Sequence, residues 1–450
     1  MRGCINIINA IILAAGKGTR MKSEKPKCAF PILEKPMINY IIDALDKTMV
    51  EKKIVVVGYK KEVFYELLND VTFAEQKNQL GTADAVKAAL DYLDDGITLI
   101  IPGDTPLINC EKINSLIELQ LSLKKDITIL TTYLDDPTGY GRILRENGKI
   151  TRIVEEKDAY EDEKEIKEVN TGIMVVDNKF LKEAIHKIDN NNAKREYYLT
   201  DLLKFTDEIA SIILGKNELL YGINDLYTLS VVEDLVRKKI LRMHTTNGVN
   251  IINADTVTVY PDVVIEEGVT IYPNCFIRGN TVIKKGAVIG PNTEIYNSTI
   301  LENAKVKHSV VYDSTIGQFA TIGPFAHIRM NAIIGPNNRI GNFVEVKNSI
   351  LGDTTKASHL SYLGDSKIGD NVNIGCGSIT VNYDGKKKSK TIIGNNVFVG
   401  CNSNLIAPVE IKDNAFIAAG STITDNVDES DLAIARSRQI NKKGYAKKYK

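Results

Sequence analysis

The sequence predicts two folds in one chain: an open α/β sheet, followed by a parallel β-helix built from hexapeptide repeats. The second prediction rests on aliphatic residues that recur at every sixth position, as from Ile393 to Ile423. At about 100° per residue, an α-helix would scatter residues six apart over three faces. Short strands joined by turns instead return each of these residues to one interior. The three series are Val259, Ile265, Ile271, Ile277, Ile283, Ile289 and Ile295; Ile316, Ile322, Ile328, Ile334, Ile340 and Val346; and Ile393, Val399, Leu405, Ile411, Ile417 and Ile423.

The first half of the chain alternates short apolar runs with amphipathic stretches. This alternation predicts an open α/β sheet, whose ligand site lies at the carboxyl ends of its strands. We expect buried parallel strands at residues 8–14, 53–57, 97–101 and 127–131, and covering helices near residues 36–48, 82–94 and 111–124.

Between the two halves, apolar residues recur at helical spacing from Leu226 to Ile240, and Gly248 follows this pattern. One helix is therefore expected to connect two domains. We assign residues 1–226 to the α/β domain, 227–247 to a helical linker and 248–450 to the β-helix, which ends in a lysine-rich tail.

Two details of the repeats bear on packing and function. Residues 381–390 interrupt the repeats and carry four lysines, and an insertion of this kind predicts a loop that projects from one coil. The fourth residue after an aliphatic is usually small, so that it fits between larger side chains in a narrow prism. These small positions are Val269, Cys275, Thr281, Ala287, Thr293 and Thr299.

The composition argues against several classes of function. Lysine plus arginine and aspartate plus glutamate both number 57, so no overall field favours nucleic acid or an anionic membrane. No apolar run reaches the ~18 residues that a membrane helix needs. The six cysteines form no CxxC pair, which in a chain of this size is typical of reduced thiols. We therefore expect a soluble, cytoplasmic protein without nucleic-acid partners or membrane insertion.

A glycine-rich turn follows the first predicted strand. Residues 13–21 read Leu-Ala-Ala-Gly-Lys-Gly-Thr-Arg-Met, and Lys25 and Lys27 follow. Such a turn exposes backbone N–H groups, to which Arg20 and Lys27 add positive charge, and both features suit a triphosphate. The turn matches neither a Walker A loop nor a full dinucleotide fingerprint. A purely structural strand–helix turn is therefore the alternative.

Two further segments favour the phosphate site. Gly103 and Asp104 come directly after the predicted strand 97–101, where a carboxylate can hold Mg²⁺ beside phosphate. Residues 76–82 read Gln-Lys-Asn-Gln-Leu-Gly-Thr. Together with the glycine-rich turn, these segments resemble those of the sugar-1-phosphate nucleotidylyltransferases. The resemblance continues through residues 139–142, 154–158, 170–172 and 222–224.

With the hexads included, the whole chain resembles the bacterial bifunctional family that joins an N-acetylglucosamine-1-phosphate uridylyltransferase to a glucosamine-1-phosphate N-acetyltransferase. The resemblance implies a Rossmann-like open sheet followed by a left-handed parallel β-helix, although the usual crossover rule would favour the opposite hand. It also implies a homotrimer formed through the β-helices. The implied activity begins with acetyl transfer from acetyl-CoA to glucosamine-1-phosphate. Mg²⁺-dependent uridylyl transfer from UTP to N-acetylglucosamine-1-phosphate follows, with release of pyrophosphate. The product, UDP-N-acetylglucosamine, would supply cell-wall precursors for peptidoglycan and lipopolysaccharide.

In the α/β domain the resemblance implies a uridylyl-transfer site. Arg20 and Lys27 would act on the triphosphate, and Asp104 and Asn224 would bind Mg²⁺. Chemistry of this type needs positioning and charge neutralisation more than a side-chain base. The residues implied in binding the nucleotide and the sugar phosphate are Leu13, Ala14, Ala15, Gly16, Lys27, Gln76, Gly81, Thr82, Gly103, Gly141, Glu155, Asn170 and Asn224.

In the β-helix, the family's acetyltransferase motif matches around His359, in a stretch between Val346 and Ile368 where the six-residue register is lost. An imidazole can take the proton from an amine that attacks a thioester. The other histidines are interpreted as structural. The resemblance assigns the amino-sugar phosphate to Arg329, Lys347, Tyr362 and Asn373, and acetyl-CoA to Cys376, Asn382, Tyr383, Cys401, Ala419 and Arg436.

The chain departs from the family pattern at several positions. Cys376 and Cys401 stand where alanine and serine are expected, Phe30 replaces a polar residue, and Met330-Asn331 replaces a proline–glycine turn after Arg329. Two other interpretations also stay open on the sequence. The β-helix could serve only oligomerisation or regulation, which His359, Lys347 and Arg329 argue against. Alternatively, the chain could be a non-catalytic scaffold that binds nucleotide sugars, and Mg²⁺-dependent pyrophosphate release from UTP would exclude that.

Overall fold

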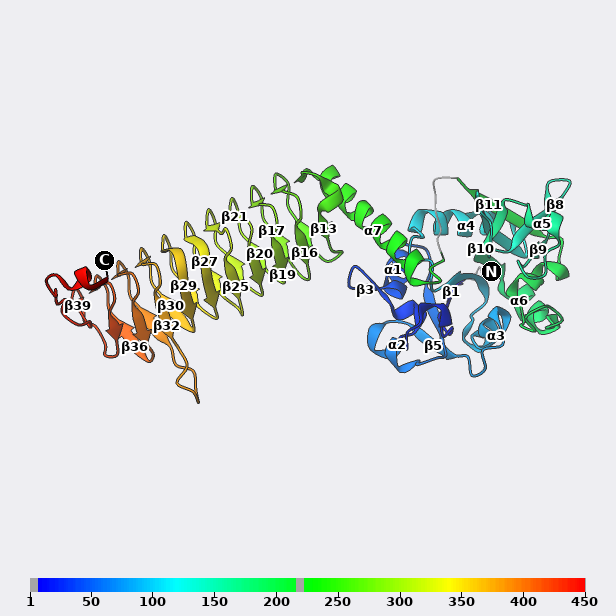
Figure 1. The fold of residues 1–450 in the computed structure, drawn as a ribbon. Coiled ribbons are helices and arrows are strands. Elements are labelled where there is room, and N and C mark those ends of the chain that lie inside the picture. Colours follow the sequence, from blue (N-terminus) through cyan, green and yellow to red (C-terminus); the bar gives the residue numbers. More distant parts are fainter. Residues whose placement is uncertain (1–6, 216–221, 450) are drawn as a thin grey trace, which may run out of the picture. The chain divides into compact units, whose positions relative to one another are not determined.

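The computed structural model describes residues 7–215 and 222–449 and consists of two compact units, Met1–Val236 and Arg237–Lys450 (Figure 1). The division falls within helix α7, Leu226–Thr246. In the first unit, the Leu33 backbone N–H donates to Glu233 of this helix, whereas Leu241 belongs to the core of the second unit. None of the described helices has both the length and the hydropathy that a membrane-spanning segment requires.

The first unit is built on a mixed sheet with the strand order β11-β7-β10-β6-β1-β4-β5. The four strands predicted from the sequence are present as β1, β4, β6 and β7. The sequence did not predict β10, which runs antiparallel between β6 and β7, because its first half is polar and Gly172 interrupts it. The strands are β1 (Ile7–Leu13), β2 (Pro31–Ile32), β3 (Lys35–Pro36), β4 (Lys52–Val57), β5 (Thr72–Glu75), β6 (Gly96–Pro102), β7 (Ile127–Tyr133), β8 (Arg142–Glu146), β9 (Lys149–Val154), β10 (Glu168–Asp177) and β11 (Ile209–Leu214).

Helices cover both faces of this sheet, because alternate strand residues are apolar on both sides. Ile12 of β1 packs in a core with α1, α2 and α4, while its neighbour Ile11 packs in a second core with α3, α6 and η5. The predicted helix at residues 82–94 is shorter than expected, since α3 ends at Lys87 and a 3-10 turn follows. The helices are α1 (Met37–Leu45), α2 (Glu62–Leu67), α3 (Thr82–Lys87), α4 (Cys110–Leu123), α5 (Glu161–Lys164) and α6 (Asn178–Ala184), with 3-10 turns η1 (Thr19–Met21), η2 (Lys27–Ala29), η3 (Leu90–Tyr92), η4 (Ile185–Lys187) and η5 (Leu199–Phe205).

The second unit is a parallel β-solenoid. Strands pair with the strand three further along, as β14 (Val264–Ile265) does with β17 (Val282–Ile283) and β17 with β20 (Thr299–Ile300), so three strands make one coil. The partners Val264 and Val282 are separated in the sequence by three complete hexads, which is the length of one coil.

The solenoid strands form two sheets. One contains β12 (Asn250–Ile251), β13 (Thr258–Val259), β15 (Thr270–Ile271), β16 (Phe276–Arg278), β18 (Val288–Ile289), β19 (Glu294–Tyr296), β21 (Lys305–Val306), β22 (Val310–Tyr312), β24 (Thr321–Ile322), β25 (His327–Arg329), β27 (Arg339–Lys347), β29 (Lys356–Gly364), β31 (Asn373–Ile374), β32 (Ile379–Val381), β34 (Phe398–Val399), β35 (Asn404–Ile406), β37 (Phe416–Ile417), β38 (Thr422–Ile423) and β39 (Leu432–Ala433). The other contains β14 (Val264–Ile265), β17 (Val282–Ile283), β20 (Thr299–Ile300), β23 (Thr315–Ile316), β26 (Ile333–Ile334), β28 (Ile350–Leu351), β30 (Ser366–Ile368), β33 (Thr391–Ile393) and β36 (Val409–Ile411). The 3-10 turns η6 (Ala254–Thr256) and η7 (Tyr445–Tyr449) lie near its two ends.

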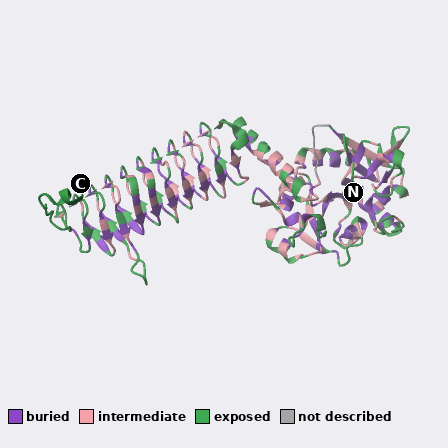
Figure 2. Ribbon diagram, in the orientation of Figure 1, coloured by how far each residue is buried: buried purple, intermediate pink, exposed green. Residues whose placement is uncertain are grey.

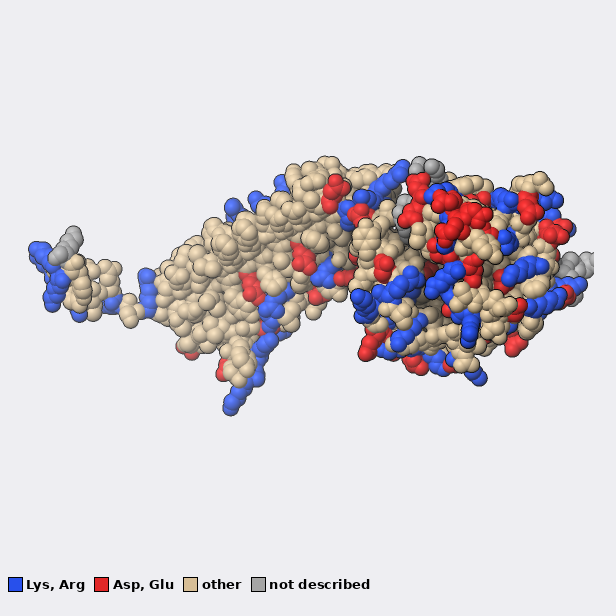
Figure 3. Space-filling view, turned by 45° about the vertical axis from the view of Figure 1, so that its right-hand side comes forward, with Lys and Arg blue, Asp and Glu red and all other residues tan. Residues whose placement is uncertain are grey.

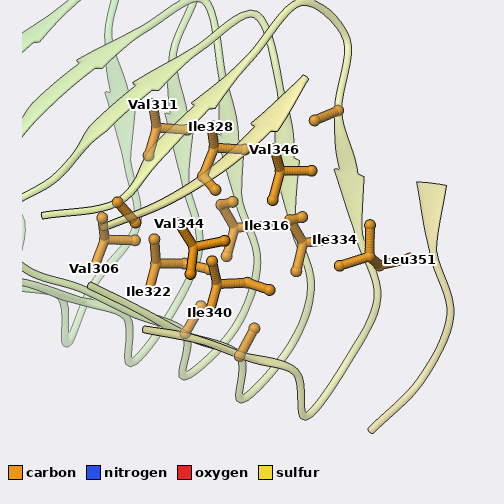
Figure 4. Packing of buried hydrophobic residues seen from close by; sticks show 14 of the residues in the cluster. Val306, Val311, Ile316, Ile322, Ile328, Ile334, Ile340, Val344, Val346 and Leu351 are labelled. Atoms are coloured by element: carbon orange, nitrogen blue, oxygen red, sulfur yellow. The ribbon is translucent and has the colours of Figure 1, made fainter. Parts of the chain in front are cut away.

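The interior of the solenoid is a continuous column of aliphatic side chains. Every residue of the three predicted six-residue series is buried in this column, which confirms the predicted register (Figure 2). Figure 4 shows Ile316, Ile322, Ile328, Ile334 and Ile340 gathered between the strands.

Two predictions about the repeats are wrong in register. Thr299 does not occupy a buried small position: Ile283 pairs with Ile300, one residue short of three full hexads, so Ser298 takes the interior place. The solenoid also does not lose its register between Val346 and Ile368, because Leu351, Ala357 and Leu363 continue the buried row. Some steps in this row are one residue shorter than a hexad, as from Val346 to Leu351. A search for aliphatic residues six positions apart therefore does not find the continuation of the row.

The insertion at residues 381–390 forms a hairpin that projects from the coil between β32 and β33, as predicted (Figure 1). Tyr383 and Lys388 pair antiparallel across it. Basic side chains extend along this hairpin in Figure 3, in agreement with its four lysines.

Candidate active sites

The first candidate site is a cavity of about 400 Å³ where β1, β5 and β6 end. Its position follows the rule for open α/β sheets, whose ligands bind at the carboxyl ends of the strands. The predicted residues that line the cavity are Leu13, Ala15, Gly16, Lys27, Gln76, Gly81, Thr82, Asp104, Glu155 and Asn170. Of the other residues predicted for this site, Ala14, Gly103 and Gly141 are buried, and Arg20 contacts Asn224.

The glycine-rich turn brings the Lys27 segment against the end of β1. Gly18 has a φ of 65°, and a Cβ atom at this position would lie 2.6 Å from the Lys27 Cβ. A side chain would therefore both strain the backbone and push Lys27 away. The backbone N–H of Gly103 donates to the Leu13 carbonyl at 2.9 Å, which joins the ends of β6 and β1.

Cationic and oxygen-bearing side chains meet at one point of this site. The Lys27 ammonium contacts the Asp104 carboxylate and donates to Asn224 Oδ1 at 2.9 Å. Arg20 donates to the same Asn224 oxygen at 2.9 Å. The backbone N–H of Ile223 donates to the Asp104 carbonyl at 3.0 Å and holds the two oxygen-bearing segments together. Three segments far apart in the sequence thus place two oxygen ligands around one cation.

The opposite part of the cavity holds Glu155 and Asn170. Burial raises the pKa of Glu155, and a hydrogen bond from the Thr200 hydroxyl at 3.2 Å partly offsets this effect. The Asn170 backbone N–H donates to the Gly141 carbonyl at 2.8 Å, and Asn170 Oδ1 accepts from the Gly172 N–H at 3.0 Å. The amide nitrogen of Asn170 is therefore the group that this side chain offers to a ligand.

Several lining residues were missed by the sequence analysis. Gln79 donates to the Ala15 carbonyl at 3.1 Å, and its place three residues after Gln76 in the same motif was the available signal. Burial raises the pKa of the Cys28 thiol to about 12, so this side chain contributes a neutral thiol to the lining at neutral pH. No local pattern marked the rest. The missed residues are Cys28, Gln79, Ala85, Pro102, Gly172, Met174, Glu196, Leu199 and Thr200.

The second candidate site lies on the solenoid, where turns of successive coils stack along one edge. Backbone N–H groups of Gly377, Asn402 and Gly420 donate to the carbonyls of Leu360, Cys376 and Cys401, each at 2.7 Å. The Arg436 side chain lies against Gly420. We call this row the acyl edge, defined by His359, Cys376, Cys401, Ala419 and Arg436, all of which were predicted from the sequence.

His359 begins the acyl edge and has a partner on the preceding coil. Its Nδ1 lies 2.8 Å from Asn342 Oδ1, and the two residues stand opposite each other in the β27–β29 register. Because a carboxamide oxygen only accepts hydrogen bonds, Nδ1 carries the proton in this contact. Nε2 then keeps its lone pair, which is the state that a general base requires. The sequence analysis missed Asn342, although it lies 17 residues, about one coil, before His359.

A second row of turns carries the predicted cations. Lys347 Nζ lies 3.2 Å from the Asp365 carboxylate, which also accepts hydrogen bonds from Asn348 and Asn382. The Asp365 backbone N–H donates to the Lys347 carbonyl at 3.0 Å. Arg329 is one coil further back and pairs with Glu345 at 2.7 Å. We call this row the cation edge, defined by Arg329, Lys347, Asp365 and Asn382.

The remaining predicted residues lie around these two edges. Tyr362 stands on β29 between them, opposite Glu345, while Asn373 on β31 pairs with Lys356 at the start of β29. Tyr383 lies on the projecting hairpin and donates to the Gly385 carbonyl at 2.8 Å. The structure thus separates the sequence-predicted acetyl-transfer residues into two groups on one chain.

Comparison with known proteins matches both units. The nucleotidyl transferase family model matches residues 9–208, and the bacterial transferase hexapeptide model matches residues 313–348 and 390–425. The model of the GMPPB C-terminal domain matches residues 259–330.

Three curated relatives, each named bifunctional protein GlmU, align over almost the whole chain. The protein from Acholeplasma laidlawii is 54% identical over 97% of both chains. The protein from an Exiguobacterium species is 47% identical over 98% of this chain and 99% of its own. The protein from a Geobacillus species is 48% identical over 97% of both. This chain belongs to the GlmU family.

GlmU proteins are bifunctional enzymes in which a uridylyltransferase and an acetyltransferase together make UDP-N-acetylglucosamine, and this chain carries both domains. Membership in the GlmU family decides between the three interpretations of the sequence in favour of the bifunctional enzyme. Each match also covers one candidate site: the nucleotidyl transferase model covers most of the cavity, and the hexapeptide model covers parts of both solenoid edges.

Proposed function

We propose that this chain makes UDP-N-acetylglucosamine at two separate active sites. The solenoid acetylates glucosamine-1-phosphate with acetyl-CoA, and the α/β unit then transfers a uridylyl group from UTP to N-acetylglucosamine-1-phosphate. The observation that carries the proposal is the gathering of polar side chains into one cluster in each unit, Lys27 with Asp104 and Asn224 in the first and His359 with Asn342 in the second. The product would supply precursors of peptidoglycan and lipopolysaccharide.

In the uridylyl-transfer site, Gln76, Gly81 and Thr82 would hold the uracil, while Leu13, Ala14, Ala15, Gly16 and Gly103 would hold the nucleoside. Gly141, Glu155 and Asn170 would hold the sugar phosphate. A phosphate oxygen of the sugar phosphate attacks the α-phosphorus of UTP, and pyrophosphate leaves. Arg20 and Lys27 hold the triphosphate in line with that oxygen, so catalysis rests on orientation and on balancing negative charge.

The residues Asp104 and Asn224 fit a Mg²⁺ site. Their oxygen atoms already share one cation, the Lys27 ammonium, so the fold brings two hard oxygen ligands to one point. Mg²⁺ in enzymes of phosphate chemistry is often bound by one or two protein ligands together with substrate phosphates. When bound, the ion would neutralise negative charge on the phosphate oxygens.

In the acetyl-transfer site, His359 Nε2 takes a proton from the amino group of the sugar as the nitrogen attacks the thioester carbonyl. The imidazolium then returns that proton to the departing CoA thiolate, and the new amide remains on the sugar. Arg329, Lys347, Tyr362 and Asn373 would hold the sugar phosphate. The residues proposed to hold acetyl-CoA are Cys376, Asn382, Tyr383, Cys401, Ala419 and Arg436.

The spacing of the two edges supports a site shared between copies of the chain. Along β29, His359 on the acyl edge and Gly364 beside the cation edge are five residues apart, which corresponds to roughly 16 Å of strand. The sugar phosphate carries its amino group and its phosphate on adjacent carbons of one ring. This spacing supports a site in which a second copy of the chain brings its cation edge, with Arg329, to this His359.

Exposed apolar side chains near the acyl edge support this self-association. The rings of Phe325 and Phe343 stack with centroids 5.6 Å apart and stay about 58% and 59% exposed. Leu360, next to His359, is equally exposed. By the family resemblance we propose a homotrimer. We also place the enzyme in the cytoplasm, because the described cysteines are all free thiols.

Two single substitutions test whether the activities occupy separate sites. His359→Ala should lower acetyl transfer to glucosamine-1-phosphate by at least about 100-fold, the usual contribution of a general base. Uridylyl transfer to N-acetylglucosamine-1-phosphate should be unaffected in this variant. Asp104→Asn should have the opposite effect, with pyrophosphate release lost and acetyl transfer kept. If either variant lost both activities while remaining folded, the two-site proposal would be wrong.

A further inference from the structure

The Gln76 side chain, at the base end of the cavity, is held by two groups that only accept hydrogen bonds. Its amide Nε2 donates to the Gly81 carbonyl at 3.1 Å and to the Asp84 carboxylate at 2.8 Å. Gln76 itself is only 6% exposed, follows β5 directly and is fixed by its backbone N–H on the Val57 carbonyl. Asp84 lies in the first turn of α3, whose position is set by Gly81.

The position of Gly81 depends on its being glycine. Its φ is 126°, and a Cβ atom there would lie 2.5 Å from the Tyr197 carbonyl oxygen. Both acceptors of Gln76 Nε2 are therefore fixed by the backbone around the start of α3, one as the Gly81 carbonyl and the other as the side chain of Asp84.

These two acceptors determine which way the Gln76 carboxamide faces. If the carboxamide were flipped, so that its oxygen and nitrogen exchanged places, Oε1 would meet a carbonyl oxygen and a carboxylate. Two hydrogen bonds would then become two repulsive contacts. The nitrogen is thus held on the Asp84 side, and the oxygen, a pure acceptor, is left for a ligand in the cavity that Gln76 lines.

A fixed acceptor distinguishes between pyrimidine bases. Uracil and thymine carry a hydrogen on N3 and can donate it to Oε1. Cytosine has a lone pair on N3 and an amino group beside it, so it would need the opposite orientation of the carboxamide. A site whose buried polar group is left unpaired rejects such an analogue strongly.

We propose that Asp84 is a positioning residue that makes the nucleotide site selective for bases with an N3–H group. It acts through Gln76 and does not itself touch the nucleotide. This inference rests on the proposed uridylyl transfer and adds the residue that sets its base selectivity.

The test compares kcat/KM for UTP, CTP and dTTP, with N-acetylglucosamine-1-phosphate as acceptor, in the wild type and in Asp84→Asn. An asparagine at this position can present an N–H to Gln76, so the substitution removes one of the two contacts that oppose the flipped carboxamide. Only the Gly81 carbonyl then disfavours that orientation. The UTP-to-CTP ratio of kcat/KM should fall at least tenfold, which equals about 1.4 kcal/mol. The UTP-to-dTTP ratio should not change, because both bases carry the N3 hydrogen. A loss of stability alone would lower all three values together.

Asp91→Asn is the matched control, since it makes the same charge change at an exposed position. It should leave both ratios at the wild-type values. If Asp84→Asn kept the wild-type UTP-to-CTP ratio, the role assigned to Asp84 would be wrong even though uridylyl transfer stands. If the wild type released no pyrophosphate from UTP, the proposed function itself would fail. Equilibrium binding of UTP and CTP to the wild type and to Asp84→Asn would then still report on the orientation of the Gln76 carboxamide.

Discussion

At the scale of single residues, the structure shows how one neighbour can select the reactive form of another. His359 has two ring nitrogens, and only one of them can face the substrate as a base. The contact of Nδ1 with Asn342 Oδ1 assigns the proton to the nitrogen that faces the preceding coil. A base held in the wrong tautomer has no lone pair at the reacting position, which in other enzymes costs far more than one hydrogen bond.

We expect Asn342→Ala to lower kcat for acetyl transfer by at least roughly tenfold, because the tautomer is no longer fixed. The KM for acetyl-CoA should change little. Asn342→Asp should restore much of the rate and shift the pH–rate profile upward, since a carboxylate favours the imidazolium. Asn280→Ala provides a matched control at an exposed position of the solenoid. Steady-state kinetics over a range of pH test this, and an unchanged kcat in Asn342→Ala would contradict it.

At the scale of elements, the cation edge depends on one carboxylate that joins three coils. Asp365 accepts from Lys347 and Asn348 on the preceding coil and from Asn382 at the base of the projecting hairpin. Burial by itself raises the pKa of Asp365, but the hydrogen bonds from Asn348, Lys347 and Asn382 lower it by more, so the pKa is lowered overall. The same carboxylate therefore positions a proposed phosphate ligand and a proposed acetyl-CoA ligand.

This lowered pKa predicts how stability depends on pH. A carboxylate whose pKa is lower in the folded state stabilises the fold at every pH above its unfolded pKa, about 3.9 for aspartate. The contribution is lost as the pH falls through the lowered folded value. Thermal unfolding of the wild type and of Asp365→Asn should differ by a constant amount from neutral pH down to about pH 4. The two curves should converge below that, and a difference that vanished near neutral pH would contradict this account.

The hexapeptide pattern predicted the strands of the solenoid because each hexad is a local unit, and a local period reports the buried position directly. It failed where coils lose a residue, as at Thr299, since the shift to Ser298 depends on pairing with the next coil. Asp84, Asn342 and Asp365 carry no motif of their own. Asn342 and Asp365 each have a partner about one coil away in the sequence, so adding a coil length to a predicted residue would have indicated both. Asp84 is recognised only from the geometry around Gln76.

At the scale of the whole molecule, the two units have separate hydrophobic cores. The cavity lies entirely in the first unit, while the acyl and cation edges lie in the second. Uridylyl transfer should therefore need one copy of the chain, and acetyl transfer should need at least two.

A mixing experiment tests the shared acetyl-transfer site. His359→Ala and Arg329→Ala should each be inactive alone, because the first removes the base and the second removes a phosphate ligand. Co-expressed in equal amounts, they should assemble hybrid trimers in which about one quarter of the sites combine an intact His359 with an intact Arg329. The hybrids should therefore recover about one quarter of the wild-type rate of acetyl transfer. Uridylyl transfer, which both variants retain, serves as the internal control, and failure of the hybrids to recover acetyl transfer would place both residues in one chain's site.

Successive coils of the solenoid are separated by a constant spacing along its axis, whether a coil has 17 or 18 residues. Each coil advances the chain by one strand spacing, about 4.8 Å, and returns it to the same orientation. Adding or removing one complete coil of three hexads upstream of Asn342, such as the one between Val264 and Val282, would move the acetylation machinery along the axis without turning it. The position of the acetyl-transfer residues along the solenoid axis can therefore be changed by whole coils, while their arrangement relative to one another is preserved.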